Sequence, residues 1–187
     1  MKKKILYALL FAFVVIQFIR PEKNIAAQAS PNDIVTHYDV PDQVLSVLKR
    51  SCYDCHSNNT QYPWYYNVQP VAWWLDHHIK DGKRHLNFSE FNQYSFKRKN
   101  KKMEEVAESV TEGWMPLNSY LWIHTNAKLS DADAKAVADW AKAMQKKIMT
   151  DSLRSVKTEV NFLDKFHEVE LFFINKFRAE NFSLQNN

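Results

Sequence analysis

The stretch Ser51-Cys52-Tyr53-Asp54-Cys55-His56 is the most informative part of this chain. It holds both cysteines of the 187 residues, and a histidine follows the second cysteine directly. This Cys-x-x-Cys-His pattern is typical of covalent c-type haem attachment. The two thiols can add to the two vinyl groups of one haem, and the adjacent imidazole can then bind the iron. We therefore predict one haem c, held by Cys52 and Cys55, with His56 as its proximal ligand.

Other uses of a cysteine pair compete with haem. A redox dithiol is typical of a βαβ setting, which the surrounding sequence lacks. A zinc site would need two histidines in addition to the cysteines, for example His77 with His78, or His124. A purely structural role is the third alternative. The histidine next to Cys55, and the lack of any further cysteine, favour haem over all three.

The composition favours helices and excludes some classes of protein. There are only two glycines and six prolines, while Lys, Glu, Ala and Leu are frequent, so a turn-rich β fold is disfavoured. Aromatic residues make up 14% of the chain, which suits the lining of a large flat cofactor. The formal charge is only +4, and no ordered basic motif indicates nucleic acid. We predict an all-α, cytochrome-c-like haem domain.

The N-terminus reads as an export signal. Lys2-Lys3-Lys4 precedes the apolar residues 5–19, and Arg20-Pro21 ends the run. Residues 1–29 are therefore a signal peptide or a membrane anchor, and residues 5–19 could tether the chain to a membrane. Ala27-Gln28-Ala29 resembles a cleavage site, which leaves both alternatives open. In either case the domain would lie in the periplasm or on the outer face of the inner membrane.

Residues 30–149 are expected to form the haem domain. Residues 26–39 are polar and read as a linker into it. Apolar periodicity then predicts helices that begin near Pro41, Pro70 and Lys101, and a last one that begins with the capping box of Ser130. Two glycines and one serine mark further helix ends: Gly82 and Gly113 as C-terminal caps and Ser89 as an N-cap. The basic residues 97–102 read as a solvated face.

The second axial ligand must be a sulfur or an imidazole, and Met115 is the first choice. It follows the helix that Gly113 ends and precedes Pro116, so it lies on a stiff loop where a side chain can be aimed. The alternatives are His124, a few residues further on, and His78, which shares the apolar face of its predicted helix. A methionine that only packs against the porphyrin edge is the simpler reading of Met115.

The chain resembles the haem-binding domain family of bacterial, exported c-type cytochrome-like proteins over roughly residues 16–145. The residues that carry the resemblance are Ile16-Gln17-Phe18-Ile19-Arg20-Pro21-Glu22-Lys23-Asn24, Cys52-Tyr53-Asp54-Cys55-His56-Ser57-Asn58-Asn59-Thr60, Tyr62-Pro63-Trp64-Tyr65, Gln69-Pro70-Val71-Ala72-Trp73-Trp74, Leu86-Asn87-Phe88-Ser89-Glu90-Phe91, Met115-Pro116-Leu117-Asn118-Ser119-Tyr120, His124, Ala127-Lys128-Leu129-Ser130 and Trp140. The resemblance implies one covalent haem, a mostly helical domain and export. Asn118 departs from the expected small residue or proline, and the chain after Met149 lies outside the family pattern.

Residues 150–187 form a separate extension with an amphipathic helical pattern. Its apolar stripe consists of Phe162, Phe166, Val169, Phe173 and Phe177, flanked by Leu163 and Ile174. A helix folded onto the domain is one expectation. A contact with a second copy or a partner through residues 162–177 is another, and an interfacial membrane helix is disfavoured by the mixed charge of the polar side.

Electron transfer is the function that these features favour. A haem bound by His56 and a methionine has no open site for a substrate, so it passes electrons to a redox partner protein, here unidentified. The alternative is a peroxidase-like haem enzyme or a gas or redox sensor whose distal site is open or exchangeable. The sequence contains no acid–base pair or hydrolytic triad, which favours an electron-transfer or haem-binding protein over an enzyme.

Overall fold

The computed structural model describes the backbone of residues 1–184, and side-chain surroundings for residues 1–162, 165 and 166. Eight α-helices and three short 3-10 helices follow one another in this part of the chain: α1 (Lys2–Ile16), α2 (Ile34–His37), α3 (Asp42–Ser51), α4 (Tyr53–His56), η1 (Trp64–Asn67), α5 (Val71–His85), η2 (Phe88–Gln93), α6 (Phe96–Glu112), α7 (Asn118–Leu121), η3 (Thr125–Ala127) and α8 (Asp131–Leu184). The described residues contain no β-strand, only one isolated bridge between Ile25 and Asn59. The prediction of an all-α chain is confirmed.

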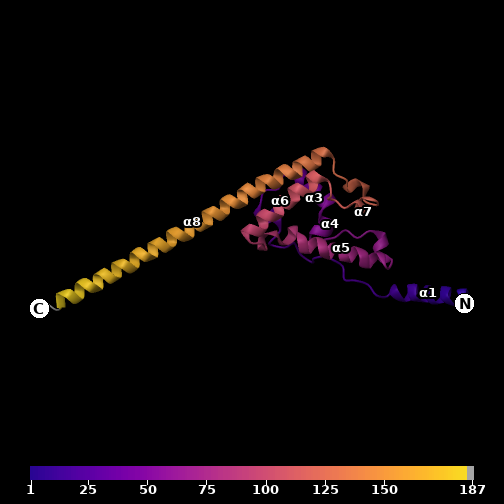
Figure 1. The fold of residues 1–187 in the computed structure, drawn as a ribbon, viewed down its shortest axis with the longest axis horizontal. Helices are drawn as coiled ribbons and strands as arrows, with labels where there is room; N and C mark the ends of the chain where they lie inside the picture. The colour runs from indigo at the N-terminus through magenta and orange to yellow at the C-terminus, as the bar shows by residue number, and fades with distance from the viewer. Residues whose placement is uncertain (185–187) are drawn as a thin grey trace. The chain divides into compact units, whose positions relative to one another are not determined.

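The chain divides into two compact units, Met1–Gln145 and Lys146–Asn187. The first unit contains the cysteine motif and a helical body that includes α3, α4, α5 and α6 (Figure 1). Its core is formed by one apolar face each of α3, α6 and the first turns of α8: Val44, Val47, Leu48, Met103, Val106, Ala107, Val110, Val137, Ala138, Ala141 and Met144. Each valine, leucine or methionine among them stabilises the fold by about 1.5–3 kcal/mol when it is fully buried, and each alanine by less.

Local signals placed several helix ends correctly. Ser130 Oγ accepts a hydrogen bond from the Asp133 backbone N–H at 3.1 Å, and Asp133 Oδ2 accepts one from the Ser130 N–H at 3.3 Å, so the capping box is confirmed. Gly113 ends α6 with a left-handed φ of 74°, as expected of a C-terminal glycine. These signals worked because both partners lie within one turn of each other.

Four other local expectations are wrong. Helix α6 begins at Phe96, five residues before the expected start, because Ser95 caps it by accepting from the Arg98 N–H. Asn87 caps η2, and Ser89 donates its N–H to that cap. Within the basic run, Lys99 is buried and bonds to Asn92 at 2.7 Å, so the run is not one solvated face. The fourth error, at Gly82, is described with the site.

Residues 26–39 are not a free linker. They contain α2, whose N-cap Asp33 accepts a hydrogen bond from the Val35 N–H. Ile34 is completely buried, and the Asn92 N–H donates to the Asn32 carbonyl at 3.0 Å. A polar composition hid this packing because a single buried isoleucine and a few backbone bonds give no periodic pattern.

The second unit is the continuation of α8. Phe162 and Phe166 are exposed, and their ring centroids lie 4.5 Å apart on one face of the helix. The side chains of Leu163, Val169, Phe173, Ile174 and Phe177 lie outside the described surroundings, so most of the predicted stripe stays a prediction. Among residues 1–184, no helix combines the length and the hydropathy needed to cross a membrane.

Candidate functional site

The turn between α3 and α4 brings the motif residues together. Helix α3 ends at Ser51, and the Cys52 N–H still donates to the Leu48 carbonyl at 2.9 Å. One helical turn follows, in which the Cys55 and His56 N–H groups both donate to the Cys52 carbonyl, at 3.2 and 3.0 Å. A three-residue step along such a turn is nearly one full rotation, so both cysteines face the same side.

Both thiols are free and protonated. Burial and, to a smaller extent, the neighbouring Cys55 together raise the pKa of Cys52 from 9.0 to about 12. Burial and the adjacent Asp54 carboxylate raise the pKa of Cys55 to about 11. Redox-active cysteines have lowered pKa values because they react as thiolates. The site therefore disfavours a catalytic dithiol and offers two neutral S–H groups, the form that adds across a vinyl double bond.

His56 is oriented by a residue far along the chain. Its Nδ1–H donates to the Leu86 carbonyl at 2.9 Å, which fixes the tautomer with an unprotonated Nε2. Burial lowers the pKa of this imidazole, and the bond to Leu86 opposes that shift in part. A neutral imidazole with one nitrogen engaged by a carbonyl is the arrangement in which histidine binds metals.

Gly82 lies inside α5, which continues to His85, so the prediction that it ends this helix is wrong. Its role is to let α5 approach the motif. A Cβ at this position would lie 2.5 Å from the Cys55 carbonyl oxygen and 3.0 Å from Cys55 Cβ. Only glycine allows the α4 and α5 backbones to meet this closely.

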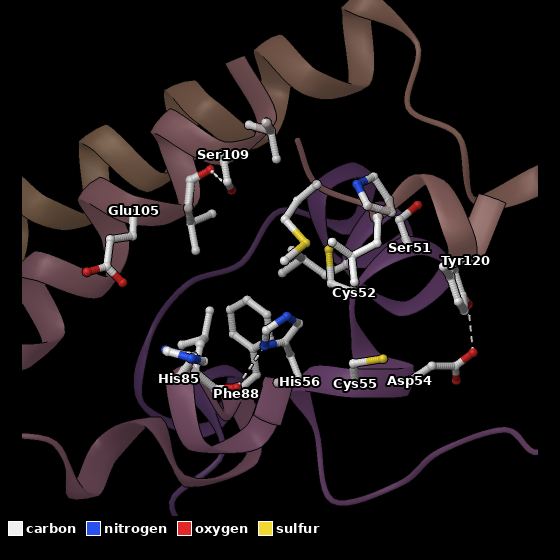
Figure 2. Close-up of a pocket in the computed structure, with 18 of the residues that line it drawn as sticks. Ser51, Cys52, Asp54, Cys55, His56, His85, Phe88, Glu105, Ser109 and Tyr120 are labelled. Atoms are coloured by element: carbon white, nitrogen blue, oxygen red, sulfur yellow. Dashed lines mark hydrogen bonds between the residues drawn. The ribbon is translucent and has the colours of Figure 1, made fainter. Parts of the chain in front are cut away.

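A mainly apolar cavity of about 490 Å³ opens in front of these residues (Figure 2). Cys52, Cys55 and His56 line it, and Leu48, Phe88, Val106, Val110 and Val137 add apolar surface. The volume lies in the range typical of cofactor sites. A flat aromatic macrocycle held by two thioethers and an imidazole fits this donor set and this lining.

The cavity has one polar edge. Lys102 Nζ and Glu105 Oε2 form an ion pair at 2.6 Å, with 15% and 39% of the two side chains exposed. Both residues line the cavity, as does His85. Figure 2 shows Glu105 and His85 on the side of the pocket away from Cys52 and Cys55. This polar edge (Lys102, Glu105 and His85) was not foreseen, because the lysine stood within an apparently solvated basic run.

The distal candidates occupy different positions. Met115 is half-buried and lines the cavity, and its N–H donates to the Ser109 carbonyl at the end of α6. His78 lines the cavity as well, with Nδ1 bonded to the Trp74 carbonyl at 2.9 Å. His77 is exposed and pairs with Asp81. Met115 and His78 are thus brought to the same cavity as His56.

His124 is held elsewhere. Its ring stacks on Tyr120 at 4.1 Å, Nδ1 bonds to the Tyr120 carbonyl at 3.2 Å, and Nε2 bonds to the Tyr65 hydroxyl at 3.3 Å. It is not among the described residues that line the cavity. The aromatic residues 64–66 could equally wrap the cofactor or form ordinary core, and within this part of the chain they do not line the cavity. Tyr66 is buried instead, and its ring centroid lies 4.1 Å from that of Tyr62.

Tyr120 makes a hydrogen bond to the cysteine motif that the sequence did not predict. Its hydroxyl donates to Asp54 Oδ2 at 2.7 Å, inside the cysteine motif. Asp54 also receives the Gln61 N–H at 3.0 Å, and its carbonyl accepts from the Thr60 hydroxyl at 2.6 Å. The spacing of 66 residues between Tyr120 and Asp54 gives no local signal.

Comparison with known proteins agrees with this geometry. A family model described as a haem-binding domain matches residues 11–143. No similar curated protein and no similar solved structure was found. Within the described residues, no three His, Cys, Asp or Glu side chains are grouped to hold a metal ion by themselves.

Proposed function

The chain belongs to the haem-binding domain family, whose model covers more than half of it, and from this we propose that it carries one haem c and transfers electrons in the cell envelope. The observation that carries the proposal is the cavity wall that unites Cys52, Cys55, His56 and Met115. The domain would then be cytochrome-c-like in function and in ligand set. When bound, the haem supplies an iron that alternates between two oxidation states.

Cys52 and Cys55 anchor the group by two thioether bonds. Each S–H would add across one vinyl double bond of a bound haem, with the sulfur on one carbon and the proton on the other. The protonated state of both thiols and their common side of the turn support this role. His56 Nε2 would bind the iron, and the Leu86 carbonyl keeps the ring from rotating.

Met115 is proposed as the distal ligand. Its backbone N–H donates to the Ser109 carbonyl, and the left-handed Gly113 ends α6 two residues earlier, so Met115 lies on a loop. A thioether raises the reduction potential relative to a second imidazole, so the identity of this ligand sets the direction of electron flow. His78 remains the rival within the cavity, and His124 would first have to leave Tyr120 and Tyr65.

The polar edge is the proposed place for the haem propionates. Thioether bonds would hold the vinyl side of a haem near the cysteines, so its propionates would lie on the opposite side of the cavity. Lys102 and His85 supply positive or hydrogen-bonding groups there, and Lys102 can exchange its bond to Glu105 for one to a carboxylate.

A haem enzyme or sensor is the second candidate. His78, Asp81 and His85 line the same cavity and could transfer protons beside an exchangeable distal site. This function requires that carbon monoxide binds to the reduced protein without prior damage to the domain. A six-coordinate electron carrier resists this ligand.

The test is an absorption spectrum of the haem-loaded protein, recorded with and without carbon monoxide, for the wild type, Met115→Ala and His78→Ala. We expect the weak far-red band of methionine-bound ferric haem to disappear in Met115→Ala alone, with new carbon monoxide binding. An unchanged band in Met115→Ala, or its loss in His78→Ala alone, would refute the proposed ligand set.

We further place the protein in the periplasm or on the outer face of the inner membrane, where c-type haem is attached. Its electrons would go to a partner protein. Residues 162–177 are a candidate for a helix-mediated contact with that partner, since Phe162 and Phe166 are exposed.

A further inference from the structure

Residues 17–26, which follow α1, are built into the haem domain. Gln17 and Gln69 bond reciprocally: Gln69 N–H donates to Gln17 Oε1 at 2.9 Å, and Gln17 Nε2 donates to the Gln69 carbonyl at 3.3 Å. Gln69 is completely buried, and its side-chain amide donates to the Ile19 carbonyl at 2.8 Å. The same carbonyl accepts from Trp73 Nε1 at 3.1 Å. The first helix therefore leads directly into the domain, without a free linker.

Asn24 joins the same segment to the loop that follows His56. Its amide nitrogen donates to the Ser57 carbonyl and to Thr60 Oγ1, both at 2.9 Å, and its backbone N–H donates to the Tyr62 hydroxyl at 2.7 Å. The Thr60 N–H returns a bond to the Asn24 carbonyl at 3.0 Å, and Lys83 Nζ donates to the Asn24 side chain at 2.5 Å. Ser57 and Thr60 are buried.

Cleavage after Ala29 would remove this seam, defined here as residues 17–26. It would remove the Ile19 carbonyl that accepts from the Gln69 side chain and the Asn24 amide that donates to the Ser57 carbonyl, so the fold would lose the net stabilisation that these intramolecular hydrogen bonds provide. The family match, which begins at residue 11, extends over the same segment. The seam thus belongs to the domain in both sequence and structure.

The surroundings of the seam suit a lipid surface. Helix α1 has no buried residue, and from Ile5 to its end it carries no charge. Where it enters the domain, Phe18 is 84% and Trp64 is 79% exposed. Arg20, two residues after Phe18, is exposed and bonds to the Asn67 carbonyl at 2.9 Å, while Lys2, Lys3 and Lys4 form the first turn of α1. Exposed aromatic and basic side chains next to an apolar helix are typical of a membrane interface with anionic lipids.

We propose that residues 1–29 stay on the mature chain, with the seam as a structural part of the haem domain and α1, Phe18 and Trp64 in contact with an anionic lipid bilayer. The haem would then be held at a fixed short distance from the membrane surface. The inference extends the cell-envelope location proposed above, but it does not depend on which residue binds the iron.

The test begins with the full chain, purified from a host that exports it and attaches haem. The intact mass should include residues 1–29, and the protein should float with vesicles of phosphatidylethanolamine and phosphatidylglycerol. A mature chain that begins at Ser30 would overturn the proposal, whatever its haem content.

Two truncated chains, each fused to a foreign signal peptide, test the structural role of the seam and the lipid contact of α1 separately. A chain that begins at Gln17 keeps every described hydrogen bond between the seam and residues 57–83, so it should melt near the full chain but no longer float. A chain that begins at Ser30 should melt at a clearly lower temperature and yield several-fold less haem protein. Equal melting of the two truncations would refute the structural role of the seam, and flotation of the Gln17 chain would refute lipid contact through α1.

Trp64→Ala tests the aromatic contact without disturbing the fold. Since the side chain is 79% exposed, melting should be unchanged while the fraction that floats falls at low vesicle concentration. Flotation equal to that of the wild type would remove Trp64 from the proposed lipid surface. Each of these measurements can fail while the haem remains covalently bound, so a failure here is distinguishable from a failure of the proposed function.

Discussion

The Tyr120 hydroxyl donates a 2.7 Å hydrogen bond to the Asp54 carboxylate, and this bond ties the segment after Met115 to the turn that holds Cys52 and Cys55. Burial and the Asp54 carboxylate both raise the pKa of Tyr120, so the phenol stays protonated and keeps donating. The proximal turn and the proposed distal loop are thus joined directly across 66 residues of sequence.

Tyr120→Phe should therefore loosen the distal loop. We expect the free energy of unfolding to fall by about 1.5–3 kcal/mol, the usual value of a hydrogen bond to a charged group, and the methionine band to weaken. Urea denaturation and the far-red spectrum measure the two effects. Tyr65→Phe is the control, because its 3.3 Å bond goes to His124 and not to the cysteine turn. Equal stability of Tyr120→Phe and the wild type would contradict the proposed link.

Gly82→Ala should impair haem attachment. Its methyl group would meet the Cys55 carbonyl at 2.5 Å, and relief of such a contact costs about 1–3 kcal/mol and displaces the motif from α5. The fraction of purified protein that carries covalent haem measures the effect. Gly113→Ala is the matched control: its new methyl group would meet nothing within 4 Å, so it suffers only its left-handed φ of 74° and leaves the contact between α5 and Cys55 intact. Full haem loading of Gly82→Ala would show that the close approach is not required.

The haem-free chain should be most stable between about pH 6.5 and 9. Burial lowers the pKa of His56 below 6.5, so the unfolded chain binds a proton that the folded chain does not, and stability falls as the pH drops below 6.5. Burial raises the pKa of both thiols above 9.0, so the unfolded chain releases protons that the folded chain keeps, and stability falls as the pH rises above 9.

Urea denaturation at several pH values measures this profile. The double variant Cys52→Ser and Cys55→Ser should lose the fall between about pH 8.5 and 9.5 and keep the fall on the acid side. A profile of the wild type that stays flat from about pH 5 to 9.5 would show that these groups are not buried in the folded chain.

Lys102 and Glu105 should tune the reduction potential in opposite directions. A positive charge at the cavity disfavours the more positive ferric state, so Lys102→Gln should lower the potential and Glu105→Gln should raise it, each by some tens of millivolts. Lys101→Gln is a closely matched control. Lys101 pairs with Glu104 in the same helical spacing at 2.9 Å, but 59% of its side chain is exposed, and solvent screens it. Equal shifts in Lys101→Gln and Lys102→Gln would remove the polar edge from the haem site.

A chain that ends after Met149 should keep its haem spectrum. The cut preserves the buried Ile148, and none of the described residues from 150 to 162 is buried. A chain that ends after Trp140 is the comparison, since it loses the buried Ala141 and Met144 and should fail to fold. A shifted spectrum in the longer truncation product would show that the extension supports the haem domain.

Sequence reasoning located the parts of this site that depend on near neighbours. The attachment motif, the Ser130 capping box and the Gly113 cap each place their partners within a few residues, so a linear pattern contains them. It also identified Met115 as a loop residue, and this residue lines the cavity.

It could not find the parts that depend on distant pairs. Leu86 orients His56 through a backbone carbonyl, which any residue type could supply. Gly82 fitted the pattern of a helix C-cap, but the reason for a glycine at this position is the close contact of its backbone with Cys55. Asn24 and Gln17 lay in a segment read as a signal peptide or membrane anchor, and only their partners 33 and 52 residues away reveal a structural role.

The intact mass of the exported protein after acid denaturation tests the central claim most directly. Two thioethers survive acid, whereas a haem held only by His56 and Met115 dissociates. We predict that the wild-type mass exceeds that of the polypeptide by one haem, and that the Cys52→Ser and Cys55→Ser double variant has the polypeptide mass alone. A wild-type mass equal to the bare polypeptide would contradict covalent attachment through Cys52 and Cys55.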